Sequence, residues 1–464
     1  MELKNLQEEL KSLKNFEEIT TIQYMKRIFG RHKRILDLSN HFIFDTSCEL
    51  LCEFIKSSSK KRNSFKTLVF KNCMLQQETL QKLLECLTQS SQNKVTHLDL
   101  GNNRMKFNLN LCKLLSVFLS RTSVKKAKVL NFQGNILEDP QGISGLFSQK
   151  FLIQELCIND TNFTPEALSK LSEFLSENYY IKKLDLRFNS EAFEDSEVME
   201  FFGRSIANNS NIEHLDLSGN HSFADIQLLT AFIDQAKSNR SLMHLGLASI
   251  GLGDKGLSHL VRFLLNDLPL SSINLENNGI SAEGLSDFIE FLPWNISGLD
   301  LAYNTFEDVT AIQSISKLLI ETRSLKRLNI SHTIEIEDLH EEVVEELCYT
   351  LTHNDTLNEF LCEGVKIAQN PDEFCLKLNE AISCRKLSLT YKIAAVNCFE
   401  GINYSQTKFD TEFSREGSPL KIISNVPSVS PFERDELQTD RKQQESPLRN
   451  SEVKTSRQYY FETP

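Results

Sequence analysis

Residues 95–103 read VTHLDLGNN and display the pattern L-x-x-L-x-L-x-x-N, in which other aliphatic residues can replace leucine. The clearest further copies are IKKLDLRFN (181–189), IEHLDLSGN (212–220), LSSINLENN (270–278) and ISGLDLAYN (296–304). Self-similarity at a nearly fixed period is the signature of a repeat protein. The repeat therefore takes precedence over any single motif in predicting the fold.

Weaker copies fill the gaps between the clear ones and bring the total to about twelve. Their fourth positions follow one another at intervals of 26 to 32 residues, about 29 on average. This period lies at the long end of the leucine-rich-repeat range. The fourth positions are Leu36, Leu68, Leu98, Leu130, Leu156, Leu184, Leu215, Leu245, Ile273, Leu299, Leu328 and Phe360.

Numbering the pattern from 1 to 9 assigns a role to each position. Positions 4 and 6 belong to a short strand and point inward, whereas positions 3, 5 and 7 point outward. An asparagine at position 9 can satisfy backbone groups of neighbouring turns and so form a ladder. Six repeats lack that asparagine, and we expect less regular turns there, at His41, Cys73, Thr161, Ile250, Thr333 and Val365.

An amphipathic helix is expected after each strand. In TPEALSKLSEFL (164–175), Thr164 is a good N-cap, Pro165 suits the first helical position, and Leu168, Leu171 and Leu175 fall on one face. Because such a helix is bulkier than the strand, stacked repeats bend. The sequence predicts an α/β leucine-rich-repeat horseshoe solenoid of about twelve repeats, with a parallel sheet on the concave face and helices on the convex face.

Both ends differ from the repeats. Residues 1–33 carry one helical apolar stripe and are expected to form a helical N-terminal cap, with a short coiled coil as the alternative. Residues 34–400 form the expected solenoid, which a last helix and strand close at 371–400. Residues 401–464 are polar and are expected to be a disordered tail. Its Ser-Pro pairs at Ser418, Ser430 and Ser446 fit proline-directed kinases.

The composition limits the cellular compartments and the kinds of partner that we expect for this protein. The formal net charge of −12 disfavours binding to nucleic acid or to an anionic membrane and weakly favours a basic protein surface. No signal peptide and no apolar run of about 18 residues occurs, which points to the cytoplasm, with the nucleus as a second compartment. The 11 cysteines are scattered without a C-x-x-C pair, so no disulfide or metal site is expected.

The repeats resemble those of the ribonuclease-inhibitor-like, intracellular leucine-rich-repeat family over about residues 34–390. That family includes the ribonuclease inhibitor, the repeat arrays of NOD-like receptors, tropomodulin-type actin proteins and the GTPase-activating protein for Ran. The resemblance implies non-covalent recognition of a protein on the concave face. The expected function is therefore that of a monomeric interaction scaffold or adaptor, with no cofactor.

The outward positions give the expected partner-binding residues. Position 5 carries an aspartate column that would suit lysine or arginine side chains, although LDL is also a favoured repeat sequence. Position 3 supplies two neighbouring histidines, position 7 two charged residues, and position 8 two aromatic anchors. The residues are Asp99, Asp185, Asp216 and Asp300, His214 and His244, Arg187 and Glu276, and Phe188 and Tyr303.

No motif indicates catalysis. The chain has no phosphate-binding GxxxxGK[ST] loop, no GxSxG and no HExxH, so the protein is not expected to be an enzyme. The main alternative is activation of a Ran-like small GTPase, since the family member acting on Ran uses an arginine in an early repeat. Arg104, directly after Asn103, is the best-placed arginine here. An actin-regulatory array and a host-directed effector are further alternatives.

Overall fold

The computed structural model describes residues 34–395 apart from short internal stretches. The chain divides into two compact units, Met1–Glu400 and Gly401–Pro464, and the described residues all belong to the first. The predicted N-terminal cap (1–33), the predicted tail and its three Ser-Pro sites lie outside the described residues. So do residues 44–47, 50, 53–64, 90–93, 121–127, 148–151, 265–268, 294, 338, 368–370 and 385–389.

The described residues form a 14-stranded parallel sheet, in which the first eleven repeats contribute β1 to β11 in chain order and the twelfth contributes β13, next to β11. Neighbouring strands pair at equivalent positions, for example Leu215 with Leu245 and Leu299 with Leu328. This common register confirms the twelve repeats read from the sequence. The strands are β1 Ile35–Asp37, β2 Thr67–Val69, β3 His97–Asp99, β4 Lys128–Asn131, β5 Ile153–Cys157, β6 Lys183–Asp185, β7 His214–Asp216, β8 His244–Gly246, β9 Ser272–Asn274, β10 Gly298–Asp300, β11 Arg327–Asn329, β12 Glu335–Ile336, β13 Glu359–Ile367 and β14 Thr390–Ala395.

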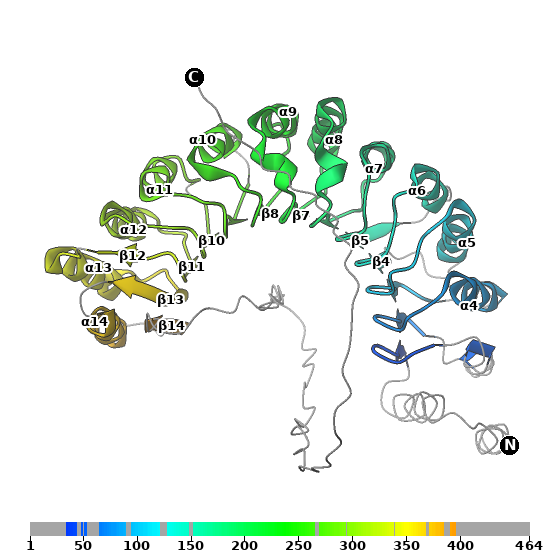
Figure 1. The fold of residues 1–464 in the computed structure, drawn as a ribbon, viewed down its shortest axis with the longest axis horizontal. Coiled ribbons are helices and arrows are strands. Elements are labelled where there is room, and N and C mark those ends of the chain that lie inside the picture. The colour runs from blue at the N-terminus through cyan, green and yellow to red at the C-terminus, as the bar shows by residue number, and fades with distance from the viewer. Residues whose placement is uncertain are drawn as a thin grey trace, which may run out of the picture. The chain divides into compact units, whose positions relative to one another are not determined.

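A helix follows most strands, and the helices lie on the outer side of the curved array while the strands line the inner side (Figure 1). Two 3₁₀ turns, η1 Ser190–Phe193 and η2 His221–Ala224, precede α8 and α9. The predicted leucine-rich-repeat solenoid is confirmed. The helices are α4 Gln77–Gln89, α5 Leu109–Ser120, α6 Pro140–Leu146, α7 Pro165–Glu177, α8 Ser196–Asn208, α9 Ile226–Ala236, α10 Gly253–Leu264, α11 Ala282–Ile289, α12 Thr310–Glu321, α13 Glu341–His353 and α14 Pro371–Ser383.

Helix α7 shows how the sequence sets these boundaries. The Thr164 hydroxyl accepts a hydrogen bond from the Ala167 amide at 3.3 Å, and Pro165 occupies the first turn. Leu168, Leu171 and Leu175 are fully buried against the strands. Such side chains, together with positions 4 and 6 of every strand, form one continuous apolar core along the array.

The predicted asparagine ladder at position 9 is present. Asn304 is 1% exposed, and its amide nitrogen donates to the carbonyl oxygens of Leu275 at 3.0 Å and Leu301 at 2.8 Å. Its side-chain oxygen accepts from the amides of Asn278 and Ile280, both at 3.0 Å. One side chain thus joins two repeats through four backbone groups. The other asparagines of the ladder are Asn103, Asn135, Asn189, Asn220 and Asn278.

The expectation of less regular turns at the six repeats without this asparagine is wrong. The residue at position 8 adopts a φ between 53° and 75° in all twelve repeats, whatever follows it. Other side chains take over part of the bonding, since the Thr161 and Thr333 hydroxyls donate to the carbonyl oxygens of Ile158 and Ile330 at 2.8 and 2.7 Å. In eleven repeats the position 8 amide donates to the position 7 carbonyl oxygen of the next repeat, so backbone bonding holds the turn with or without the asparagine.

A second asparagine ladder, which the sequence analysis missed, lies where the chain passes from a helix to the next strand. Asn239 is fully buried, and its amide donates to the carbonyl oxygens of Ile206 at 2.8 Å and Asn209 at 3.0 Å. Asn209 makes the equivalent bonds one repeat earlier, to Leu175 and Asn178. A recognisable signal exists: these asparagines stand six residues before position 4 of their repeat.

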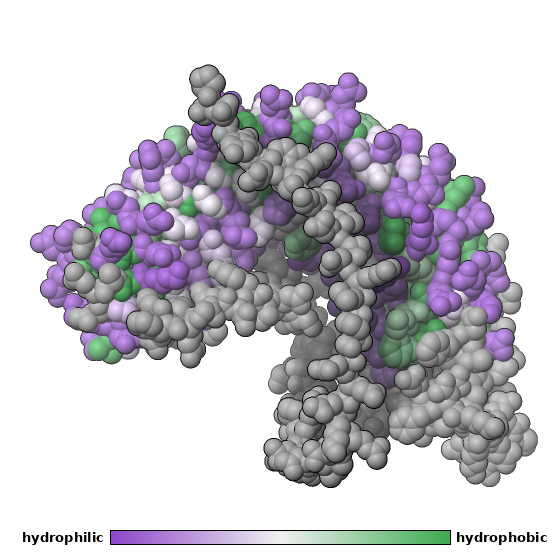
Figure 2. Space-filling view, in the orientation of Figure 1, coloured by the Kyte–Doolittle hydropathy of each residue, from purple (hydrophilic) through white to green (hydrophobic). Residues whose placement is uncertain are grey.

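The outer surface of the helices visible in Figure 2 is largely hydrophilic, with hydrophobic residues scattered among polar ones. Within the described part of the chain, none of the helices has both the length and the apolar character needed to cross a bilayer. The concave side differs from the helical side because its outward side chains stand in regular columns, one residue from each repeat.

Candidate functional site

The turn residues at position 8 form a column along the edge of the concave face, at the carboxyl ends of the strands. All have left-handed backbone conformation, which favours glycine and asparagine and costs most other residues about 1–2 kcal/mol. Nine of the twelve are indeed Asn, Gly, Asp or Ser, and the exceptions are Phe188, Tyr303 and His332. The column comprises Asn40, Asn72, Asn102, Gly134, Asp160, Phe188, Gly219, Ser249, Asn277, Tyr303, His332 and Gly364.

Two of these three aromatic side chains lie over a glycine of the following repeat. A β-carbon at Gly219 would come within 2.3 Å of the Phe188 ring, and one at Gly364 within 2.0 Å of the His332 ring. Tyr303 stacks on His332 with ring centroids 4.6 Å apart and an interplanar angle of 11°. The rings are therefore held in place by their neighbours, yet Phe188 remains 58% exposed.

The aspartates at position 5 stabilise the turns through hydrogen bonds within their own repeat. Every Asp or Asn at this position accepts a hydrogen bond from the amide two residues later, as Asp99 does from Gly101 at 2.8 Å and Asp300 from Ala302 at 3.0 Å. Asn131, Asn274 and Asn329 make the same bond. One oxygen of each aspartate is thus committed to the fold. The second oxygen of Asp300 also accepts a hydrogen bond, from the Asn329 side-chain amide at 3.0 Å, and contacts of these carboxylates with a partner stay a prediction.

Desolvation shifts the pKa of three of these aspartates. Burial raises the pKa of the Asp99, Asp216 and Asp300 carboxyl groups, although hydrogen bonds or nearby cations partly offset it. Burial also raises the pKa of Glu276, at position 7 of the repeat of β9, to about 7, and the negative charge of Asp300 adds to the shift. Glu276 and Asp300 therefore form an acidic pair whose ionised state is costly.

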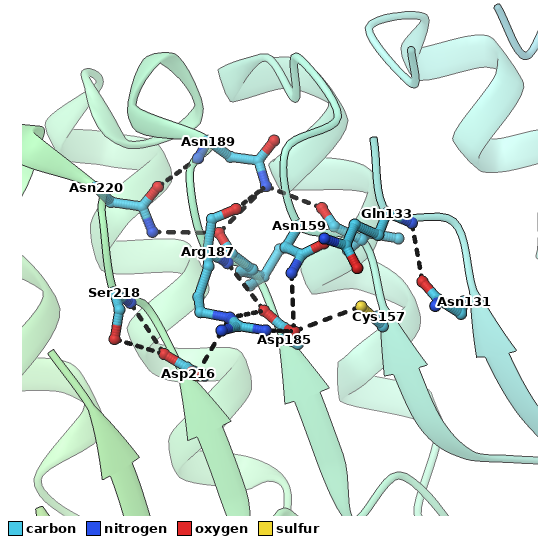
Figure 3. A network of polar contacts seen from close by, with 12 residues as sticks. Asn131, Gln133, Cys157, Asn159, Asp185, Arg187, Asn189, Asp216, Ser218 and Asn220 are labelled. Atoms are coloured by element: carbon cyan, nitrogen blue, oxygen red, sulfur yellow. Dashed lines mark hydrogen bonds and ion pairs between the residues drawn. The ribbon is translucent and has the colours of Figure 1, made fainter. Parts of the chain in front are cut away.

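Arg187 lies between two aspartates of adjacent strands (Figure 3). Its guanidinium donates to Asp185 at 2.8 and 3.0 Å and lies 3.3 Å from the Asp216 carboxylate. Cys157 and Asn159 donate to the same Asp185 carboxylate at 3.4 and 3.2 Å. The structure thus brings together three predicted partner-binding residues, but their charges largely satisfy one another.

His214 and His244 are adjacent, as expected from their shared position. Their rings stack with centroids 4.0 Å apart, and His244 Nδ1 lies 2.6 Å from the Ser272 hydroxyl. Burial lowers the pKa of both imidazoles, that of His214 to about 3, with nearby lysines contributing in the same direction. Burial therefore favours the neutral form of both rings, and the stacked pair presents a flat surface on the concave face.

Arg104 lies apart from these residues, near the start of the array. It is exposed, has a φ of 53°, and forms no side-chain ion pair with any residue in the part of the chain that the structure describes. It lines a shallow groove with Phe42 and Met74, which are 41% and 63% exposed. The sequence predicted the place of Arg104 in the turn but not this groove.

Comparison with known sequences shows limited likeness, and no family model matches the chain. The chain is 25% identical over 297 residues to Rho GTPase-activating protein gacW of Dictyostelium discoideum, covering 57% of this chain and 26% of that protein. It is 26% identical over 172 residues to FERM domain-containing protein C of the same organism, covering 35% and 11%. The chain thus spans about a quarter or less of the length of these relatives.

Solved structures show similarly distant likeness. A crystal structure of a TLR13–ssRNA13 complex gives a TM-score of 0.33 at 17% identity, covering 72% of this chain and 36% of that one. The C-terminal domain of tropomodulin from Caenorhabditis elegans gives 0.24 at 16% identity, covering 41% and 92%. The assignment as a leucine-rich-repeat solenoid rests on the twelve paired repeats of the chain itself.

Proposed function

We propose that this protein is an interaction scaffold that binds a protein partner along its concave face, in the manner of the ribonuclease-inhibitor-like class, within the cytoplasm or nucleus. The observation that carries the proposal is the choice of residues at position 8. Bulky aromatic side chains stand at Phe188, Tyr303 and His332, where the backbone favours asparagine or glycine. Strained backbone conformations cluster at functional sites, which supports a binding role for these side chains.

Capture of partners from the native cell tests this proposal with two matched variants. Phe188→Ala removes an exposed aromatic side chain from the concave edge, and Ile320→Ala removes an aliphatic side chain of similar exposure, 61%, from helix α12. We expect a partner bound by the wild-type chain to be depleted with Phe188→Ala and retained with Ile320→Ala. Equal recovery with the two variants, or loss only with Ile320→Ala, would place the binding surface elsewhere.

A second candidate function is activation of a small GTPase through Arg104. Two observations favour it: the exposed side chain has no ion-pair partner among the described residues, and one relative bears the name Rho GTPase-activating protein. A positioned arginine stabilises the charge that develops during phosphoryl transfer.

Single-turnover GTP hydrolysis by purified Ran-like and Rho-type GTPases tests this second candidate. If the chain is an activator, it accelerates hydrolysis, and Arg104→Ala reduces the acceleration by about 10³-fold or more. Arg240→Ala, in the loop before β8, is the matched control and leaves the rate unchanged. An absence of acceleration, or acceleration that survives Arg104→Ala, rejects the role of Arg104.

A further inference from the structure

The repeats of β6 and β9 place opposite charges at the same position of the motif. In the repeat of β6, position 7 is Arg187, whose guanidinium lies against the position 5 carboxylates of Asp185 and Asp216. In the repeat of β9, position 7 is Glu276, next to Asp300 of β10. The first arrangement places one cation between two aspartates and so offsets half of their charge, whereas the second adds a carboxylate where the first has a cation.

Nearby cations balance this charge only in part. Arg327 of β11 lowers the pKa of Asp300 through its charge, but it forms its ion pair with Glu359 of β13. Lys366 of β13 forms one with Glu335 of β12 at 3.1 Å. Within the described ranges, neither Glu276 nor Asp300 has an ion-pair partner at 4.0 Å or less. The face formed by β9 and β10 therefore has unbalanced negative charge that a partner can complement.

A pair of stacked aromatic rings begins in the turn that follows Asp300. Tyr303 stands three residues after Asp300 and is backed by His332 through the 4.6 Å stack. Asn277, which precedes Tyr303 in the column, turns away from it and donates to the Ser249 hydroxyl at 3.0 Å. A planar cation can stack on an aromatic ring while its N–H groups reach carboxylates, and arginine does this better than lysine.

We propose that this face binds an arginine side chain of the partner, with the guanidinium paired to Glu276 and Asp300 and packed against Tyr303. The proposal rests on the proposed function and names the chemistry of one contact within it. The pairing of Arg187 with Asp185 and Asp216 shows that a guanidinium fits beside position 5 carboxylates on this sheet. A bound guanidinium also relieves the cost of ionising Glu276, whose pKa burial raises.

Fluorescence anisotropy with a defined peptide tests the proposal. The probe is a fluorescein-labelled peptide with four arginines alternating with glycine, and its counterpart carries citrulline, which keeps the shape of arginine without the charge. Asp300→Asn removes the carboxylate charge but keeps the turn, since Asn131, Asn274 and Asn329 make the same turn bond. Asp37→Asn removes the same charge from β1, where Asp37 accepts the equivalent turn bond from the Ser39 amide at 2.9 Å, and is the matched control.

We expect the full-length chain to bind the arginine peptide at least tenfold more tightly than the citrulline peptide. Asp300→Asn and Glu276→Gln should each weaken arginine-peptide binding about tenfold, and Asp37→Asn less than twofold. Equal weakening by Asp300→Asn and Asp37→Asn would mean general attraction to an acidic chain and would overturn the proposal, as would equal binding of the two peptides.

Measuring how the captured natural partner binds the variants distinguishes the arginine contact from the scaffold proposal on which it rests. A captured partner that is lost with Phe188→Ala but retained at full affinity with Asp300→Asn leaves the concave scaffold in place and overturns the arginine contact. Loss of affinity with both variants, together with tight binding of the arginine peptide, supports both proposals.

Discussion

Asn304→Ala is expected to lower the free energy of unfolding by about 3–5 kcal/mol, because it leaves four buried backbone groups without their side-chain partner. Those groups are the carbonyl oxygens of Leu275 and Leu301 and the amides of Asn278 and Ile280. They belong to two successive repeats, so the substitution weakens an interface as well as a turn. Urea denaturation followed by circular dichroism measures the effect.

The shape of the unfolding curve gives a second readout for Asn304→Ala. In a repeat array, stability is approximately the sum of the repeats and of the interfaces between neighbours. A weakened interface near β10 should therefore broaden the transition or split it in two. Asn211→Ala is the control, since Asn211 is half-buried and its side chain makes none of the ladder bonds among the described residues. A loss below 1 kcal/mol for Asn304→Ala would contradict the stabilising role of the ladder.

Phe188→Asn is expected to change stability and binding in opposite directions. The backbone at Phe188 has a φ of 56°, which asparagine tolerates better than phenylalanine, so the variant should gain about 1 kcal/mol in free energy of unfolding. The same change removes an exposed aromatic side chain from the column. We expect the affinity for a concave-face partner to fall by at least about 30-fold, as for a binding hot spot.

Denaturation and titration of the captured partner measure both effects of Phe188→Asn. Ser249→Asn is the matched control because it changes the same position of the motif, at a φ of 54°, without removing an aromatic ring. It should gain stability and leave binding unchanged. Stabilisation of Phe188→Asn with unaltered affinity would show that the aromatic residue is not retained for binding.

Much of the fold could be predicted because the signal is repeated. The alternation seen at Leu98 and Leu100 recurs twelve times, so errors at single repeats do not disturb the register. The asparagine at position 9 was also predictable, since a buried polar side chain at a turn has few structural explanations. The second ladder could have been found as well, because Asn209 and Asn239 recur with the same spacing.

The candidate site was less predictable, for physical reasons. The left-handed conformation at position 8 is imposed by strand pairing, so Phe188 and Tyr303 show no local sign of it. The Asp185–Arg187–Asp216 pairing joins two repeats that lie 31 residues apart at equivalent positions, and its side chains could as well have faced a partner. The stack of Tyr303 on His332 likewise depends on the distance between neighbouring turns.

The pairing of each strand with its immediate neighbours has a consequence for cooperativity within the binding surface. Phe188 and Asp300 belong to the repeats of β6 and β10, four strand spacings apart, or roughly 19 Å. Side chains so far apart, without a shared contact, act independently on affinity. The coupling energy between them in a double-mutant cycle should then be near zero, and separate repeats of one array can evolve new contacts one at a time.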